Sequence, residues 1–317
     1  MKVTFLGTSG AVPTTERNPS ALLIAREGER LLFDCGEGTQ RQMMRYGTGF
    51  DVRHVFVTHL HGDHVLGLPG LTQTWEFNDR ETPLAVHAPA GTRSRVETLL
   101  SATGERPSYP VRVHQVEPGD VVLDRDAYEV RAFAVDHRTE AVGYALVEDE
   151  RKGRFDRQKA EEEFNIPPGP KYSTLHGGEP VEHDGRVIQP EEVVGPPRPG
   201  RRIVYTGDTR PTPATVDAAE DADLLVHDST FGEEHGERAR ETAHSTAREA
   251  AEIAADAGAA RLALTHVSTR YTGRTRQLEA EAGDAFDGEV FVADDGMQAT
   301  VPFPDADDEF RIERVNA

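Results

Sequence analysis

The sequence is poor in cysteine and in long apolar runs. It holds one cysteine, Cys35, so no disulfide can form within the chain, which excludes a small fold held by disulfides. No stretch reaches the roughly 20 consecutive apolar residues of a membrane helix, because charged residues, Gly or Pro interrupt every run. Residues 1–7 also lack the charged and apolar regions of a signal peptide. We therefore expect a protein of the reducing cytoplasm with no membrane role.

Lysine is almost missing as well. The chain has 35 Lys and Arg residues, and four of them are lysine, against 56 Asp and Glu and a net charge of −21. Such a surface is typical of proteins that work at high intracellular salt, where screening weakens the repulsion between like charges. We interpret the composition as halophilic, with an ordinary acidic cytosolic protein as the alternative. The charge alone speaks against a nucleic-acid partner.

Short apolar runs rich in Val, Ile and Phe recur along the chain and predict buried strands. These runs are 3–6, 21–24, 31–33, 54–57, 84–86, 130–135, 203–205, 224–226, 262–264 and 290–292. A helix is expected after His244, where Thr246 and Glu249 form a capping box and Gly258 can end the helix. A chain of 317 residues with this alternation predicts an α/β fold of two sheets between helix layers.

One long stretch, residues 149–200, breaks this rhythm. It is polar and rich in Pro and Gly, with Pro-Pro-Gly-Pro at 167–170. Loops of this length in compact domains are either functional or disordered. We interpret the stretch as an inserted arm, and a disordered surface loop remains the alternative.

The strongest chemical signal is a loop that follows the predicted strand 54–57. Four side chains of metal-ligand type, His59, His61, Asp63 and His64, fall within six residues. Extended backbone places His59 and His61 on one side, and the turn after them can direct the other two toward a second position. Imidazoles with a carboxylate suit zinc, and two metals about 3.5–4 Å apart are a recurring hydrolytic arrangement.

One loop cannot complete two metal sites, so further ligands must come from other strand ends. His137, Asp208 and His266 each stand just past the end of a predicted strand, where open α/β sheets place their sites. We therefore predict a dinuclear site. His227 with Asp228 is intermediate and could support a ligand. The other histidines lack this placement and are expected to be ordinary: His54, His87, His114, His176, His183 and His235.

These motifs resemble the metallo-β-lactamase superfamily and, within it, the ribonuclease Z family. The segments that carry the resemblance are 5–13 with 17–20, 33–42, 59–64, 135–137 with 143–144, 205–209, 243–247 and 266–271. The tail after about Phe303 and parts of the arm have no matching segment. The resemblance implies a four-layer αββα sandwich, a single domain over 1–317 with an inserted exosite arm at 149–200 and an acidic C-terminal tail at 304–317.

The resemblance also implies roles for single residues. His59, His61 and His137 would bind one zinc ion, and Asp63, His64 and His266 a second. Asp208 would bridge the two ions. Asp63 would also act as a base toward the attacking water, and His244 as a proton donor near the leaving group.

The implied activity is zinc-dependent removal of the 3′ trailer from precursor tRNA. Attack by a metal-bound hydroxide would leave a tRNA 3′-hydroxyl and a trailer with a 5′-phosphate. The resemblance also implies that the chain forms a homodimer and that its arm binds the body of the tRNA. The candidate RNA contacts are Arg151, Lys152, Arg154 and Arg157 at the start of the arm, Pro168, Gly169 and Pro170 within it, and Arg270 after the last ligand.

Two other readings stay open. A small-molecule hydrolase of the same fold would need no fifty-residue arm, so the arm argues against it. A catalytically silent RNA-binding protein that keeps zinc for stability would not need the full ligand set.

Overall fold

The computed structural model describes residues 1–104 and 106–315, which fall into two compact units. The main unit comprises Met1–Val147, Arg201–Pro302 and the residues from Asp308 onward. The arm unit comprises Glu148–Gly200 together with Phe303–Asp307. The stretch predicted as an arm, 149–200, thus lies within the arm unit, which also takes in a short piece of the C-terminal tail.

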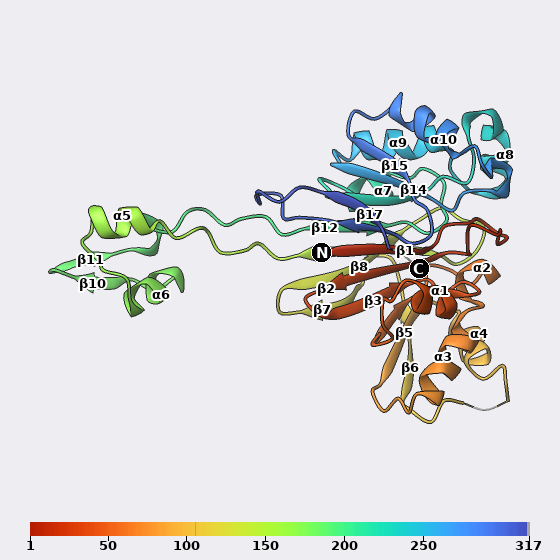
Figure 1. Ribbon diagram of the computed structural model, residues 1–317, viewed down its shortest axis with the longest axis horizontal. Coiled ribbons are helices and arrows are strands. Elements are labelled where there is room, and N and C mark those ends of the chain that lie inside the picture. Colours follow the sequence, from red (N-terminus) through yellow and green to blue (C-terminus); the bar gives the residue numbers. More distant parts are fainter. Residues whose placement is uncertain (105, 316–317) are drawn as a thin grey trace. The chain divides into compact units, whose positions relative to one another are not determined.

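The main unit contains two large sheets (Figure 1). The first has the order β17-β16-β1-β2-β3-β4-β5-β6, and its neighbours from β3 to β6 are parallel. Its strands are β1 (Lys2–Gly7), β2 (Ala21–Arg26), β3 (Glu29–Phe33), β4 (His54–Phe56), β5 (Leu84–Pro89), β6 (Val111–Val116), β16 (Met297–Thr300) and β17 (Arg311–Arg314).

The second sheet has the order β15-β14-β13-β12-β9-β8-β7, and its neighbours from β12 to β15 are parallel. Its strands are β7 (Val121–Arg125), β8 (Tyr128–Ala134), β9 (Val142–Glu148), β12 (Arg202–Tyr205), β13 (Leu224–Asp228), β14 (Arg261–Thr265) and β15 (Glu289–Val292). Each of the ten apolar runs predicted as strands coincides with a strand of the two sheets, with Val57 and Val135 lying one residue past the ends of β4 and β8.

Helices cover the outer face of each sheet. The first sheet packs against α1 (Thr39–Arg45), α3 (Leu68–Phe77) and α4 (Arg93–Leu100). The second packs against α7 (Pro213–Ala218), α9 (Ala247–Asp256) and α10 (Thr275–Gly283). Shorter helices of this unit are α2 (Gly62–Val65), α8 (Gly236–Thr242), η2 (Glu233–His235) and η3 (Thr269–Tyr271). The predicted capping box opens α9, and Gly258 follows its end in a left-handed conformation.

The layers follow from strands that are buried on both faces. In β2, Leu22 and Ile24 belong to the core between the two sheets, whereas Ala21 and Leu23 belong to the core under the first helix layer. Continuous apolar runs are what such doubly covered strands require. The main unit is therefore an αββα sandwich, as the sequence predicted.

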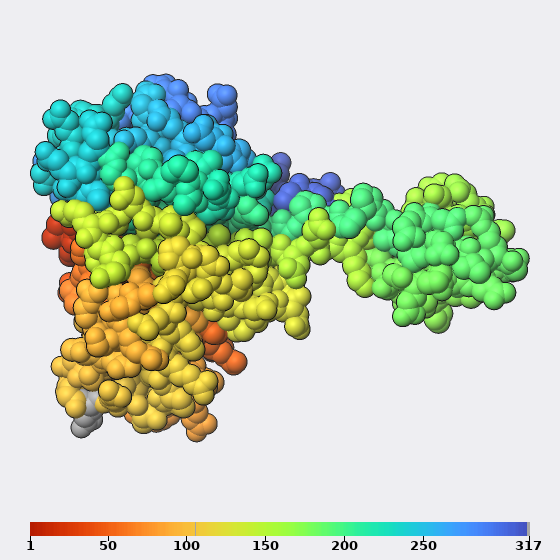
Figure 2. Space-filling view, turned by 180° about the vertical axis from the view of Figure 1, so that it is seen from behind, coloured from red at the N-terminus to blue at the C-terminus, as the bar shows by residue number. Residues whose placement is uncertain are grey.

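The arm unit has secondary structure and a small core of its own. It contains α5 (Arg157–Glu162), α6 (Pro170–His176), the hairpin strands β10 (Val181–His183) and β11 (Arg186–Ile188), and η1 (Pro190–Glu192). Its buried core residues are Ala160, Ile166, Leu175, Val181, Ile188 and Val193. Figure 2 shows the green surface of the arm unit as a rounded body. No helix in the described parts of either unit has the length and apolarity to cross a membrane.

Candidate metal centre and catalytic site

The seven predicted metal ligands lie together at the carboxyl ends of strands from both sheets. His59 and His61 follow β4, and Asp63 and His64 lie on the short helix α2 directly after them. The remaining three, His137, Asp208 and His266, follow β8, β12 and β14. Strand ends supply the ligands because the strands are rigid and their ends converge on one edge of the sandwich.

The first ligand group is His59, His61, His137 and Asp208, whose ligand atoms all lie within 4.8 Å of one another. The His61 Nδ1 atom is 2.9 Å from His59 Nε2 and 3.2 Å from His137 Nε2. Asp208 Oδ2 lies 3.6 Å from His59 Nε2 and 4.0 Å from His137 Nε2. Three imidazoles and one carboxylate oxygen thus surround a single position.

The second group is Asp63, His64, Asp208 and His266. The other oxygen of Asp208, Oδ1, lies 3.2 Å from His64 Nε2 and 3.2 Å from His266 Nε2. Asp63 Oδ2 is 3.1 Å from His266 Nε2. Each group therefore takes one oxygen of the Asp208 carboxylate, which is the geometry of a bridging ligand.

Hydrogen bonds on the side of the ring that faces away from the ligand group fix the orientation of three of the histidines. The Nδ1 atom of His64 lies 2.7 Å from Asp34 Oδ2, and that of His266 lies 2.8 Å from the Thr230 hydroxyl. His137 Nδ1 is 2.9 Å from the backbone carbonyl oxygen of Ala243. Such contacts set the tautomer and leave the opposite nitrogen for a metal.

The residues present are of the kinds that hold divalent metal ions. Six buried side-chain atoms of the described residues have no hydrogen-bond partner, and two of them are His64 Nε2 and Asp208 Oδ1. Both atoms belong to the second ligand group, and an unpaired buried polar atom is costly unless something binds it. Burial lowers the pKa of His59 and His137. The His59 and His137 rings are therefore neutral at pH 7, the form that binds a metal. Burial acts in the same direction on His64, but the charges of Asp208 and Asp34 outweigh burial and raise the pKa of His64.

Two glycines let the backbone come close around the centre. Gly207 has φ +60°, and a Cβ at this position would stand 2.7 Å from the side chain of Thr58, the residue before His59. A Cβ on Gly10 would stand 2.6 Å from the backbone oxygen of His266. The N-terminal loop continues from Gly10 to Ala11, whose N–H donates to Asp63 Oδ2 at 2.8 Å.

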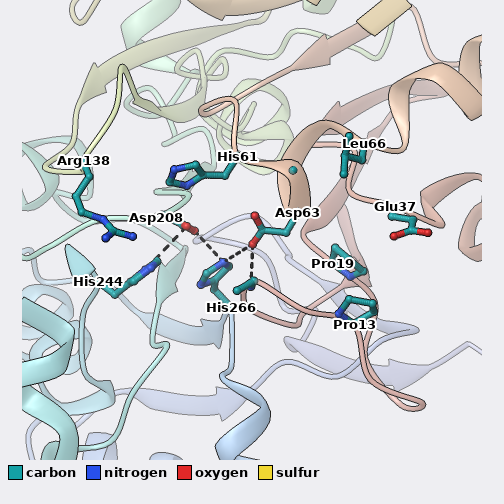
Figure 3. Close-up of a pocket in the computed structure, with 12 residues that line it drawn as sticks. Pro13, Pro19, Glu37, His61, Asp63, Leu66, Arg138, Asp208, His244 and His266 are labelled. Carbon is teal, nitrogen blue, oxygen red and sulfur yellow. Dashed lines mark hydrogen bonds and ion pairs between the residues drawn. The ribbon is translucent and has the colours of Figure 1, made fainter. Parts of the chain in front are cut away.

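His244 lies beside the two ligand groups (Figure 3), and Asp228 holds its ring by a hydrogen bond. Its Nδ1 atom is 2.8 Å from Asp228 Oδ2, and its ring stacks on that of His266 with 5.1 Å between centroids. Burial lowers the pKa of His244, but the negative charge and hydrogen bond of Asp228 outweigh burial and raise the pKa to about 9. His244 is therefore protonated at neutral pH, with Nε2 left for a substrate.

The site opens into a pocket of about 350 Å³, here called the metal pocket. Figure 3 shows His61, Asp63, Asp208 and His266 along it, with His244 and Arg138 on one side. A phosphodiester that enters this pocket meets the ligand groups and His244 together.

The structure places the candidate RNA contacts in different settings. Arg151 and Arg154 form ion pairs with Asp305 inside the arm unit. Pro168 and Gly169 lead into α6, which begins at Pro170. The other candidates are exposed: Lys152 and Arg157 in the arm unit and Arg270 in the main unit.

Sequence reasoning gave no role to Asp34 and left Asp228 undecided. Asp34 is fully buried and accepts hydrogen bonds from the Thr58 backbone and from the Tyr205 hydroxyl, besides its contact with His64. The sequence signals for Asp34 are its place directly after the apolar run 31–33 and within the segment 33–42 that carries the resemblance. His227 points elsewhere, with Nδ1 2.8 Å from the carbonyl oxygen of Asp228.

The histidines expected to be ordinary lie outside the ligand groups. His54, His87 and His114 stack on one another across β4, β5 and β6. His176 and His183 contact backbone carbonyl oxygens in the arm unit, at 3.0 and 2.8 Å. The ring of His235 packs near Phe231 and Tyr271.

Two family descriptions match parts of the chain. Residues 1–140 match the family described as Anti-Pycsar protein Apyc1, and residues 180–267 match the Beta-lactamase superfamily domain. Among solved structures, the short form of human tRNase Z has a TM-score of 0.70 and 28% identity, covering 96% of this chain and all of that one. The metallo-β-lactamase fold protein YhfI of Bacillus subtilis has a TM-score of 0.68 at 21% identity, covering 94% and 98%, and supports the fold alone.

Curated relatives match nearly end to end. The Ribonuclease Z of Haloarcula marismortui is 67% identical over 308 residues, covering 97% of this chain and 99% of the relative. That of Haloferax volcanii is 61% identical over 308 residues, covering 97% of both. These are halophilic archaea, in agreement with the halophilic interpretation of the composition. With relatives this similar over almost its whole length, the chain belongs to the ribonuclease Z family.

Proposed function

We propose that this chain is a zinc-dependent endoribonuclease that removes the 3′ trailer from precursor tRNA in the cytoplasm. Its relatives of 60% identity and more bear the name Ribonuclease Z. The single observation that carries the chemistry is the pair of ligand groups joined by the two oxygens of Asp208. A carboxylate shared in this way suits two metal ions at the distance that phosphodiester hydrolysis uses.

The seven clustered side chains would act as metal ligands. His59, His61 and His137 would hold one zinc ion, Asp63, His64 and His266 the other, with Asp208 between them. When bound, two zinc ions supply an acidified water and positive charge for the phosphate oxygens. Ligand side chains held by neighbours such as Asp34 keep these positions fixed without reorganisation.

Proton movements fall to Asp63 and His244. Asp63 Oδ2 is oriented by the backbone N–H of Ala11, and the carboxylate can accept the proton of the attacking water. His244, with Nδ1 toward Asp228, can donate from Nε2 to the leaving 3′-oxygen. The products are then a tRNA with a 3′-hydroxyl and a trailer with a 5′-phosphate.

The arm supports tRNA over a small substrate. We propose that Lys152, Arg157 and the segment Pro168–Gly169–Pro170 contact the tRNA body. Arg151 and Arg154, at the start of the arm, would also contact it. Arg270 would contact RNA near the metal pocket. We further propose a homodimer in which the arm of one subunit serves the site of the other.

The test is cleavage of an end-labelled precursor tRNA by the purified protein in molar KCl. We expect one cut at the end of the acceptor stem, loss of cutting with a chelator, and recovery with zinc. The Asp208→Asn variant serves as the matched control. Metal-independent cutting, or cuts scattered along the RNA, would contradict the proposal.

A further inference from the structure

A second pocket of about 500 Å³ adjoins the metal pocket. Ala11, Arg138, His244 and His266 line both. Three arginines from separate segments complete it: Arg138 after β8, Arg238 on α8 and Arg270 on η3. We call it the arginine pocket. Three distant parts of the chain thus bring guanidinium groups to one place beside His244.

The arginine pocket contains no carboxylate. None of its lining residues is Asp or Glu, although the chain has 56 acidic residues against 35 basic ones. Arg138, Arg238 and Arg270 are exposed, and their guanidinium groups form no ion pair or hydrogen bond with any other described residue. A concentration of unpaired positive charge in so acidic a protein indicates a site for an anion.

Arginine is the side chain suited to this task at high salt. At 1 M salt the Debye length is about 3 Å, so long-range attraction between charges is lost. Direct contacts persist, and the planar guanidinium can give two parallel hydrogen bonds to one phosphate. Short-range phosphate contacts of this kind do not depend on the net charge of −21.

The position beside His244 indicates which phosphates would bind. This step rests on the proposed function, in which His244 gives a proton to the leaving 3′-oxygen. That oxygen belongs to the last nucleotide of the mature tRNA, so this nucleotide must lie on the His244 side of the cut. We propose that the arginine pocket binds the backbone phosphates of the RNA strand immediately 5′ of the cut, through Arg138, Arg238 and Arg270.

The test combines arginine variants with neutral linkages in the substrate. Two precursor tRNAs each carry one uncharged methylphosphonate, either at the first linkage 5′ of the cut or at the first linkage 3′ of it. Arg138→Ala, Arg238→Ala and Arg270→Ala are compared with wild type. Arg112→Ala is the matched control, because Arg112 is an exposed arginine of β6 outside the pocket. Zinc content and thermal unfolding verify that each variant folds.

We expect each pocket variant to raise KM for unmodified RNA about 10-fold with little change in kcat, since a hydrogen bond to a charged group is lost. The 5′ methylphosphonate should raise KM of wild type to a similar extent and have less effect on the variants. Arg238→Lys keeps the positive charge but loses the planar guanidinium group that can give two parallel hydrogen bonds. Its KM should therefore lie between those of wild type and Arg238→Ala. Arg112→Ala should resemble wild type.

The outcomes separate the two proposals. Failure of wild type to cut precursor tRNA would overturn the proposed function and this inference with it. If wild type cuts and the pocket variants behave as Arg112→Ala does, the arginine pocket alone is refuted. If the variants lose sensitivity to the 3′ linkage instead, the pocket holds the trailer and the assignment to the 5′ side is overturned.

Discussion

The main unit and the arm unit differ in how much core supports them. Three hydrophobic cores pack both faces of the main unit's sheets, whereas six buried residues form the core of the arm unit. Small units bury a smaller share of their surface and are correspondingly less stable. The proposed metal pair needs ligands held within about 0.5 Å, whereas the proposed contacts of the arm follow the shape of the RNA and need less exact placement. The chemistry is built where the core is large.

The arginines of the two units differ as well. At the root of the arm unit Arg151, Arg154 and Arg198 all pair with Asp305 from the C-terminal tail, and Arg151 also lies over the Phe303 ring. In the arginine pocket of the main unit no carboxylate is present. The arginines that pair with Asp305 therefore bind the C-terminal segment to the rest of the arm unit. Those of the arginine pocket remain available to a ligand.

The largest effect is expected at the shared carboxylate. Asp208→Ala removes an oxygen from each ligand group, so we expect loss of zinc from both positions and a fall in cleavage on the order of 10³-fold or more. Elemental analysis and single-turnover cleavage measure the two effects. Asp305→Ala in the arm unit should keep its zinc. Full zinc content in Asp208→Ala would show that Asp208 does not bridge.

Removal of the arm should separate the two units functionally. Val147 and Arg202 are direct partners in the antiparallel pair of β9 and β12, so an Asn-Gly turn can replace residues 149–200. We expect kcat/KM for precursor tRNA to fall on the order of 10²-fold, because a second point of attachment is lost. Hydrolysis of a small phosphodiester should persist. If activity on precursor tRNA and on the small phosphodiester fell equally, the arm would be needed for folding of the main unit rather than for binding of tRNA.

A smaller effect is expected at the residue that holds His244. Asp228→Asn should lower kcat about 10- to 100-fold, because the His244 ring loses the carboxylate that orients and charges it. If Asp228 acts through His244, the double variant with His244→Ala should be no slower than His244→Ala alone. Additive losses would show an independent role for Asp228. Pre-steady-state cleavage rates decide between the two.

The smallest effects concern one aspartate in each unit, with opposite pH dependence. Burial raises the pKa of Asp295 to about 6, despite hydrogen bonds from Asn18 and Thr8. Asp295 therefore contributes most to stability below about pH 4, and this contribution is lost as pH rises through 6. Asp295→Asn should gain about 2 to 3 kcal/mol relative to wild type between pH 4 and 7, by denaturant unfolding at high salt.

Asp305 should show the reverse. Its surroundings oppose each other, since burial raises the pKa of Asp305, but the contacts with Arg151 and Arg198 outweigh burial and lower it. The stabilisation is then present above about pH 4 and is lost as pH falls. Asp305→Asn should loosen the arm unit slightly at pH 7, and progressively less as the pH falls below 4, as limited proteolysis with an acid-tolerant protease can measure. If the effects of Asp295→Asn and Asp305→Asn changed with pH in the same direction, the predicted difference between the two units would be contradicted.

The sequence predicted elements best where both faces of a strand are buried. Each of the ten apolar runs coincides with a strand to within one residue at its end, and the helix after His244 begins at its predicted cap. Strands with exposed or mixed faces were missed, and so was β9, although all but one of its residues are buried. In β7 a single residue, Leu123, is buried, and β17 pairs with β16 at the sheet edge although its sequence is polar. Tertiary pairing, rather than apolar pattern, makes these segments strands.

What the sequence determined by itself is the ligand chemistry: the residue types, their position after strands and the layered fold that brings strand ends together. What only the tertiary structure decided are contacts between segments with no mutual sequence pattern. Asp34 behind His64, Asp228 behind His244, Asp305 among the arm arginines and the three arginines beside the metal pocket are of this kind. Periodicity records burial along one element, but an ion pair depends on which distant segments meet, and only the packed fold fixes that.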